Sequence, residues 1–123
     1  MNSKKIGRDI NLKNNQLTLG NGYDHCWVLN DFDGSVRKIA SAYSDQSGIQ
    51  MDVYTDQPGV QLYTGNFLNG SISSKKGLKY EKRFGFCLET QHFPDSPNKA
   101  FFANVYLNPG EKFQSRTVYK FIN

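Results

Sequence analysis

A glutamate in a strand-like stretch has the surroundings in this chain that best suit chemistry. Residues 84–91 alternate between a face of large apolar side chains and a face that carries Gly85, Cys87 and Glu89, which is the two-residue period of a strand. Because Gly85 and Cys87 are small, the space in front of the Glu89 carboxylate is open to a small polar ligand. The run 94–98, with two prolines, predicts a turn after this strand. A glutamate on a strand is more often a rim residue of a solvated face, and that interpretation stays open.

An aspartate beside a histidine invites an acid–base interpretation, which strand geometry argues against. Residues 23–29 predict a strand in which Asp24 and His25 are neighbours, and neighbours in a strand point to opposite faces. We therefore interpret His25 as a packing or hydrogen-bonding residue, and His92 as a loop residue at the edge of the site. From its position alone, Asp24 is a strand-entry residue that satisfies backbone N–H groups.

Four stretches of the sequence share a resemblance to one family. They are Gly22–Trp27, Pro58–Asn66, Cys87–Asn98 and Tyr106–Glu111. Their residue sequences resemble those of the aldose 1-epimerase (galactose mutarotase) family, and the third stretch resembles the signature around that family's catalytic glutamate. The likeness continues over nearly the whole chain from about Ile6 onward.

The resemblance implies a role for three residues. Glu89 is expected to be the catalytic base, and Asp24 and Gln61 are expected to bind substrate hydroxyls. Enzymes of the family interconvert the α and β anomers of a free hexose such as galactose or glucose, by acid/base ring opening and without a cofactor or a metal. The amide of Gln61 offers a polyol both a donor and an acceptor, although an exposed strand glutamine is the simpler interpretation.

The resemblance covers only the C-terminal part of the longer family proteins. The acid histidine, a second active-site histidine and a substrate-binding arginine belong to the upstream part, and neither His25, His92 nor Arg8 matches their motifs. We therefore expect a fragment, a truncated product or one piece of a split protein. It is an isomerase by resemblance, but is expected to be weak or inactive alone. Two hypotheses remain open beside it: a non-catalytic carbohydrate-binding β-sandwich, and a remnant that kept the strands and lost the site.

The composition favours an all-β fold in a single domain, residues 1–123. Aromatic residues make up 14% of the chain, and short runs rich in Val, Ile, Tyr, Phe and Thr are separated by Gly, Asn, Asp and Pro. We predict an antiparallel β-sandwich, which the resemblance implies is the C-terminal portion of a larger galactose mutarotase-like supersandwich. One hairpin is predicted from 36–43 and 49–55, and a closing hairpin from 100–107 and 112–122.

Charge and cysteine content narrow the classes of partner. A net charge of +4 from scattered Lys and Arg is typical of a soluble protein and does not indicate nucleic-acid binding. No run is long and apolar enough for a membrane span, and the N-terminus lacks the apolar core of a secretion signal, so a cytoplasmic location is the default expectation. Cys26 and Cys87 are predicted to be buried thiols without a disulfide. The expected partners are a monosaccharide and, for strands that lack neighbours, a second copy or a missing N-terminal part.

Overall fold

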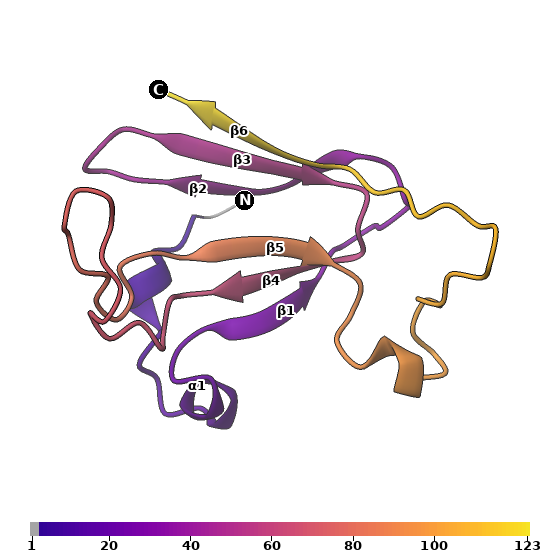
Figure 1. The fold of residues 1–123 in the computed structure, drawn as a ribbon, viewed down its shortest axis with the longest axis horizontal. Helices are drawn as coiled ribbons and strands as arrows, with labels where there is room; N and C mark the ends of the chain where they lie inside the picture. Colours follow the sequence, from indigo (N-terminus) through magenta and orange to yellow (C-terminus); the bar gives the residue numbers. More distant parts are fainter. Residues whose placement is uncertain (1–2) are drawn as a thin grey trace. The chain divides into compact units, whose positions relative to one another are not determined.

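The computed structural model describes residues 3–123, and strands dominate it (Figure 1). The elements in chain order are the 3-10 turn η1 (Ile6–Arg8), helix α1 (Asn15–Leu19), strands β1 (Asp24–Val28), β2 (Arg37–Tyr43), β3 (Gln50–Thr55), β4 (Gly59–Tyr63) and β5 (Cys87–Gln91), the 3-10 turn η2 (Ser96–Asn98) and strand β6 (Thr117–Ile122). The strands form two three-stranded sheets, with the orders β1-β4-β5 and β2-β3-β6. Neighbouring strands run in opposite directions in both (Figure 1). The predicted fold class is confirmed: the chain is all-β, with two antiparallel sheets and very little helix, as in a β-sandwich.

Contacts divide the chain into two compact units. Unit 1 contains residues 1–25 and 61–88, and unit 2 contains residues 26–60 and 89–123. The sheet β2-β3-β6 belongs wholly to unit 2, whereas β1, β4 and β5 each pass from one unit into the other. The single domain expected from the sequence stays a prediction.

The first predicted hairpin is confirmed. Strands β2 and β3 pair antiparallel, from Tyr43 opposite Gln50 to Arg37 opposite Thr55, and the connection contains the predicted Asp and Gly. In this connection Ser44 donates its N–H to the carbonyl of Ile49, which closes the turn next to the first strand pair.

The predicted closing hairpin is wrong. Residues 100–107 form no strand, and β6 pairs with β3 instead, with Thr117 opposite Thr55. The aromatic residues of the missing strand pack elsewhere: the ring of Phe102 contacts Phe101 and Phe93, at centroid distances of 4.9 and 5.1 Å. Ring contacts of Phe102, and no strand pairing, are therefore what the structure has in this segment.

Strand β5 is shorter than predicted, because a turn precedes it. Phe84 donates its N–H to the carbonyl of Glu81, and the strand begins only at Cys87. Phe84 and Phe86 are therefore exposed outside the strand, and they do not form the apolar face that alternation predicted.

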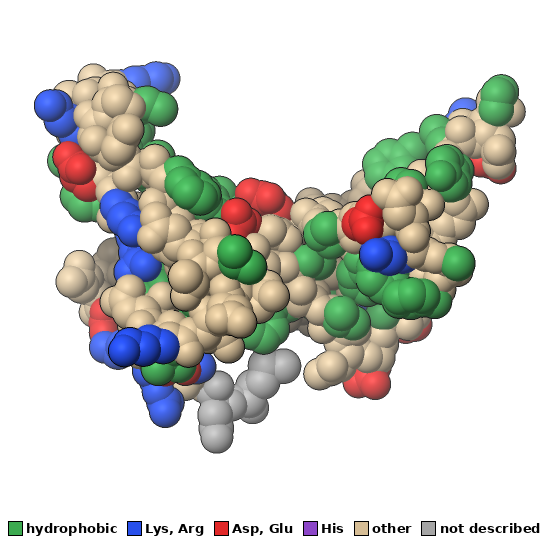
Figure 2. Space-filling view, turned by 90° about the horizontal axis from the view of Figure 1, so that it is seen from below, with side chains coloured by type: hydrophobic (Ala, Val, Ile, Leu, Met, Phe, Trp, Pro, Cys, Tyr) green, Lys and Arg blue, Asp and Glu red, His purple; other side chains and the backbone are tan. Residues whose placement is uncertain are grey.

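The described residues bury few apolar side chains. Those that are buried are Ile10, Val53 and Val60, whereas the buried polar set is larger: Asp52, Thr55, Gln57, Thr64, Asn66 and Ser96. Many large apolar side chains reach the surface, and Figure 2 shows several groups of them on one face. Buried polar groups cost free energy unless they are hydrogen-bonded, so the partners of these six side chains matter for the stability of the chain.

Two predictions about the cysteines can be compared with the structure. Cys26 and Cys87 are not joined by a disulfide, as expected. The prediction that both thiols are buried is wrong for Cys87, which is exposed because β5 begins at this residue, directly after a loop. Cys26 is half-buried, and burial raises the pKa of its thiol. Within residues 3–123, no helix has the length and apolar character needed to cross a membrane.

Candidate functional site

Asp24 and Gln61, both in unit 1, are joined by a hydrogen bond. Asp24 is the first residue of β1 and Gln61 is the middle residue of β4, and these strands are neighbours. The amide Nε2 of Gln61 donates to Oδ1 of Asp24 at 2.7 Å. The amide oxygen Oε1 of Gln61 is buried and receives no donor from the described residues. The pair therefore combines an exposed carboxylate with a buried amide oxygen that no donor among the described residues satisfies.

A buried polar network positions this pair. Asn66, which is only 2% exposed, donates from Nδ2 to the carbonyls of Gly20 and Tyr23, at 2.8 and 2.9 Å. Its Oδ1 accepts from the hydroxyl of Thr64 at 2.7 Å, and Thr64 in turn donates its N–H to the Tyr23 carbonyl. Because Tyr23 precedes Asp24 and Thr64 follows β4, the network fixes the start of β1 against the end of β4.

Gly22 allows this network to form. Its φ is 138°, and a Cβ added there would lie 2.2 Å from Oδ1 of Asn66. A side chain at this position would displace the amide that holds Tyr23. The glycine of the motif Gly22–Trp27 is therefore required by close packing.

His25 has the structural role predicted for it. Its Nδ1 accepts the backbone N–H of Asp24 at 3.1 Å, and its ring meets the ring of Tyr23 edge to face. The hydrogen bond to the main chain of Asp24 is local, and it orients the imidazole along the strand.

Glu89 lies in unit 2, and the residues that follow it are anchored to the second sheet. Glu89 is exposed in the middle of β5. The hydroxyl of Thr90 is hydrogen-bonded to that of Thr117, which lies 3.2 Å from the hydroxyl of Thr55. Three threonines thus fix the backbone that carries Glu89.

His92 continues the same anchoring. Its Nδ1 is hydrogen-bonded to Oε1 of Gln57 at 2.8 Å, and Nε2 of Gln57 donates to the hydroxyl of Ser115 at 3.0 Å. Beside them, Asp56 accepts the N–H of Arg116, and this hydrogen bond lowers the pKa of the Asp56 carboxyl. His92 is a loop residue, as predicted, and its imidazole belongs to a structural network.

The structure brings two of the three predicted site residues together. Asp24 and Gln61 are hydrogen-bonded within unit 1, and Glu89 belongs to unit 2, on the strand that follows β4 in the sheet order. A shared concavity of Glu89 and Gln61 stays a prediction. Sequence reasoning missed Asn66 and Thr64 as positioning residues, although both lie at the end of a stretch that carried the family resemblance.

No cluster of metal ligands is found in the described part of the chain. Among residues 3–123, no three or more His, Cys, Asp or Glu side chains converge closely enough to hold an ion.

The described chain is thus an antiparallel all-β protein with a carboxylate–amide pair in one unit and an exposed strand glutamate in the other. The sequence model of the aldose 1-epimerase family matches residues 1–120. This chain belongs to the aldose 1-epimerase family.

Curated relatives agree with the family match. The human protein named galactose mutarotase is 48% identical over 103 residues, which is 82% of this chain and 29% of the relative. The aldose 1-epimerase of Escherichia coli (strain K12) is 38% identical over 104 residues, covering 82% of this chain and 30% of the relative. The rat galactose mutarotase is 44% identical over 100 residues, with 81% and 29% covered. The chain therefore spans about three tenths of the length of the curated relatives that it matches.

Proposed function

We propose that this chain contributes to a mutarotase site that acts on a free hexose such as galactose or glucose. The observation that carries the proposal is the hydrogen bond between Asp24 and Gln61, together with the buried Gln61 oxygen that has no donor among the described residues. A carboxylate beside an amide presents acceptors and a donor at one place, which suits neighbouring hydroxyls of a sugar. The names of the human and bacterial relatives support the same substrate class.

In the proposed reaction, Glu89 acts as the general base. Its carboxylate takes the proton of the C1 hydroxyl while an acid protonates the ring oxygen, and the bond between C1 and the ring oxygen breaks. The aldehyde end rotates, and the reverse proton transfers close the ring on the other face. Asp24 and Gln61 hold the hydroxyls of the sugar so that the reacting oxygen meets Glu89.

The acid is proposed to come from outside these 123 residues. His25 uses Nδ1 for the backbone of Asp24, and His92 uses Nδ1 for Gln57, so both imidazoles have structural partners. A general acid contributes about 10²–10⁴-fold to such a reaction. The 123-residue chain alone is therefore expected to interconvert anomers at close to the spontaneous rate.

Sugar binding tests the first half of the proposal. The whole chain is titrated with galactose, and backbone amide signals are followed by NMR, with shifts expected at Asp24 and Gln61. Gln61→Ala removes the donor to Asp24 and the orphaned acceptor, and is expected to weaken binding about tenfold. Gln46→Ala, in the exposed turn between β2 and β3, is the matched control and should leave binding unchanged. Equal binding by both variants contradicts the assigned site.

Polarimetry tests the second half. Freshly dissolved α-galactose is followed with the chain alone and after addition of the separately purified upstream part of a relative. Acceleration that appears only in the mixture, and that Glu89→Gln abolishes, is the expected result. Fast mutarotation by the chain alone places the acid on this chain, and His92 is then the first residue to substitute.

A second candidate function is sugar binding without turnover. It is favoured by one observation: Asp24 and Gln61 lie together in unit 1 and form their hydrogen bond without any group of unit 2. Binding that depends on Gln61, with no acceleration in the reconstituted mixture, would support this binding module and contradict the mutarotase.

A further inference from the structure

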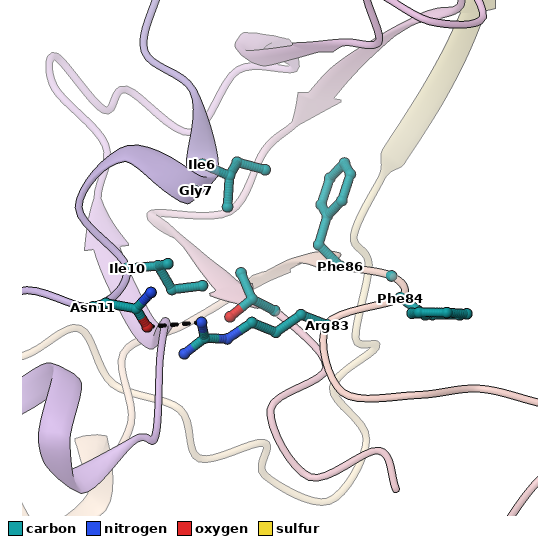
Figure 3. A pocket seen from close by; sticks show the side chains of 9 residues that line it. Ile6, Gly7, Ile10, Asn11, Arg83, Phe84 and Phe86 are labelled. Atoms are coloured by element: carbon teal, nitrogen blue, oxygen red, sulfur yellow. Dashed lines mark hydrogen bonds between the residues drawn. The ribbon is translucent and has the colours of Figure 1, made fainter. Parts of the chain in front are cut away.

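A cavity in unit 1 lies outside the residues assigned to the sugar. Its volume is about 490 Å³, which is within the usual range of small-molecule sites. Figure 3 shows Ile6 and Ile10 on one side of it and Phe84 and Phe86 on the other, with the side chain of Arg83 extended along it toward Asn11. The cavity therefore combines apolar walls with a single guanidinium.

Arg83 is held in place by neutral partners. Its Nη1 donates to Oδ1 of Asn11 at 2.8 Å, and its Nη2 donates to the carbonyl of Asn21 at 3.2 Å. Its Nε is buried and has no acceptor among the described residues. No ion pair of Arg83 is found among residues 3–123, and burying part of a cation without a counter-charge is unfavourable.

The backbone of Arg83 supports the same conclusion. Its φ is 66°, in the left-handed region that long side chains seldom adopt. Strained backbone of this kind tends to occur where a side chain is held for a ligand. The N–H of Arg83 donates to the carbonyl of Gly65, and this bond keeps the strained residue in position.

The surroundings of the cavity are basic. Unit 1 contains nine Lys and Arg against three Asp and Glu, which gives a net charge of +6. Two of its three carboxylates are engaged elsewhere, since Asp9 pairs with Lys4 and Asp24 accepts from Gln61. Charge complementarity therefore favours an anion at Arg83.

We propose that this cavity binds a small organic carboxylate with an apolar body. A planar guanidinium matches a carboxylate through two parallel hydrogen bonds, and an oxygen near Nε would satisfy the orphaned donor. The four apolar walls suit an aromatic or branched aliphatic group and would desolvate a sugar without compensation. Because Nε is buried in the free chain, the side chain has to shift toward the ligand on binding. The proposal is independent of the function assigned to Asp24, Gln61 and Glu89.

Benzoate is the probe that tests the proposal. The whole chain is titrated with sodium benzoate at constant ionic strength, and the Nε–H signal of Arg83 is followed by NMR. We expect that signal to shift with saturation, and we expect benzamide, the neutral analogue of the same shape, to bind about tenfold more weakly or worse. Equal affinities for benzoate and benzamide overturn the proposal.

Two variants locate the site. Arg83→Gln is expected to weaken benzoate binding about tenfold or more, because it removes the positive charge and the planar pair of donors of the guanidinium. Lys82→Gln removes one charge from the neighbouring residue, which does not line the cavity, and should change the affinity less than about twofold at constant ionic strength. If Lys82→Gln weakens binding as much as Arg83→Gln, benzoate is held only by the general positive charge of unit 1, and the cavity proposal is wrong.

A third variant keeps the test valid if Arg83→Gln does not fold. Phe84 is 57% exposed, so Phe84→Ala removes one wall of the cavity at little cost to folding. We expect it to weaken benzoate binding about threefold while galactose binding is unchanged. Unaltered benzoate affinity in Phe84→Ala, or displacement of benzoate by an equal concentration of inorganic phosphate, contradicts an apolar carboxylate site.

Discussion

The two units of this chain hold their site residues by different means. In unit 1, Asp24 and Gln61 depend on loop residues, chiefly the buried amide of Asn66. In unit 2, the segment that carries Glu89 is tied to a regular sheet through pairs of hydroxyl groups, such as Thr90 with Thr117. The Asn66 and Thr64 anchors of unit 1 lie in irregular structure, whereas the three threonine anchors of unit 2 lie on strands.

The two units also differ in net charge. Unit 1 carries a net charge of +6, whereas unit 2, with six Lys and Arg against eight Asp and Glu, carries −2. Several carboxylates of unit 2 are structural: Asp52 and Asp56 accept hydrogen bonds that fix the sheet and its edge. The proposed sugar-binding pair therefore lies in the basic unit, supported by the loop residues Asn66 and Thr64, while the proposed base lies in the acidic unit, supported by hydroxyl groups on strands.

The largest expected effect comes from breaking the network of unit 1. Asn66→Ala removes the side-chain donor of the Gly20 carbonyl and one of the donors of the Tyr23 carbonyl, which keeps the N–H of Thr64, and we expect it to lower the free energy of unfolding of unit 1 by about 2 kcal/mol. Amide hydrogen exchange measures this in each unit separately. Protection should fall at Thr64 and stay nearly unchanged at Val53 in the sheet of unit 2.

Asn30→Ala is the matched control for that substitution. Asn30 is exposed, so its replacement should change the free energy of unfolding by less than about 0.5 kcal/mol. If Asn66→Ala lowers protection equally in both units, then the units unfold together and the comparison between them fails.

The second effect tests the electrostatic support of unit 2. Asp52 is buried, and hydrogen bonds from Lys38, Ser41 and Gln50 lower the pKa of its carboxyl from 3.8 to about 2. Because the pKa is lower in the folded state, the stabilisation is fully present above about pH 4 and is lost as the pH falls toward 2. Urea unfolding at a series of pH values should show this loss.

Asp52→Asn isolates the contribution of that carboxylate. The variant should be less stable than the parent at pH 7, and the difference should shrink as the pH falls from about 4 toward 2, where about half of the parent carboxyl groups are protonated. Asp31→Asn, at an exposed position, is the control, and its free energy of unfolding should change with pH in the same way as that of the parent. A constant difference between Asp52→Asn and the parent from pH 7 to pH 2 contradicts the assignment.

The features that the sequence could predict are those with local signals. The hairpin of β2 and β3 was predictable because its alternation and its turn are local signals, and the antiparallel all-β class follows from many such signals together. The family motifs contain all three site residues, Asp24, Gln61 and Glu89. Their roles come from that resemblance, and the structure adds the hydrogen bond between the first two.

Long-range pairings were not predictable in the same way. Residues 100–107 have the composition of a strand, yet contacts between Phe102 and Phe93 hold them outside a sheet. In the sequence, Asn66 has the features of an ordinary turn asparagine. In the structure, its amide donates to the carbonyl of Gly20, which is 46 positions away. Nothing in the local sequence marks which distant carbonyl a buried amide will bind.

A third, smaller effect concerns the free edge of unit 2. In the sheet order β2-β3-β6, strand β6 lies at an edge, and Phe121 on it is 67% exposed. We propose that this edge associates with a second copy of the chain, because an edge strand with exposed apolar side chains tends to pair with a further strand. Phe121→Lys should weaken the association measured by sedimentation about tenfold. Phe113→Lys, outside the strands, should change it little, and a chain that is monomeric at all concentrations contradicts the proposal.

The smallest expected effect is that of Glu89→Gln on the isolated chain. Glu89 is exposed in β5, so the substitution should change the free energy of unfolding by less than about 0.5 kcal/mol. Glutamine has the same shape and keeps an acceptor for the C1 hydroxyl, so galactose affinity should change less than about threefold, in contrast to the tenfold expected for Gln61→Ala.

The value of this variant lies in the separation of binding from chemistry. An amide cannot take a proton from the C1 hydroxyl, so in the reconstituted mixture Glu89→Gln should abolish acceleration while the galactose titration stays nearly the same. Gln61→Ala should instead lower both the affinity for galactose and the rate of mutarotation in the mixture. If Glu89→Gln weakens galactose binding as much as Gln61→Ala does, Glu89 belongs to the sugar-binding group, and the division of binding and proton transfer between the two units is wrong.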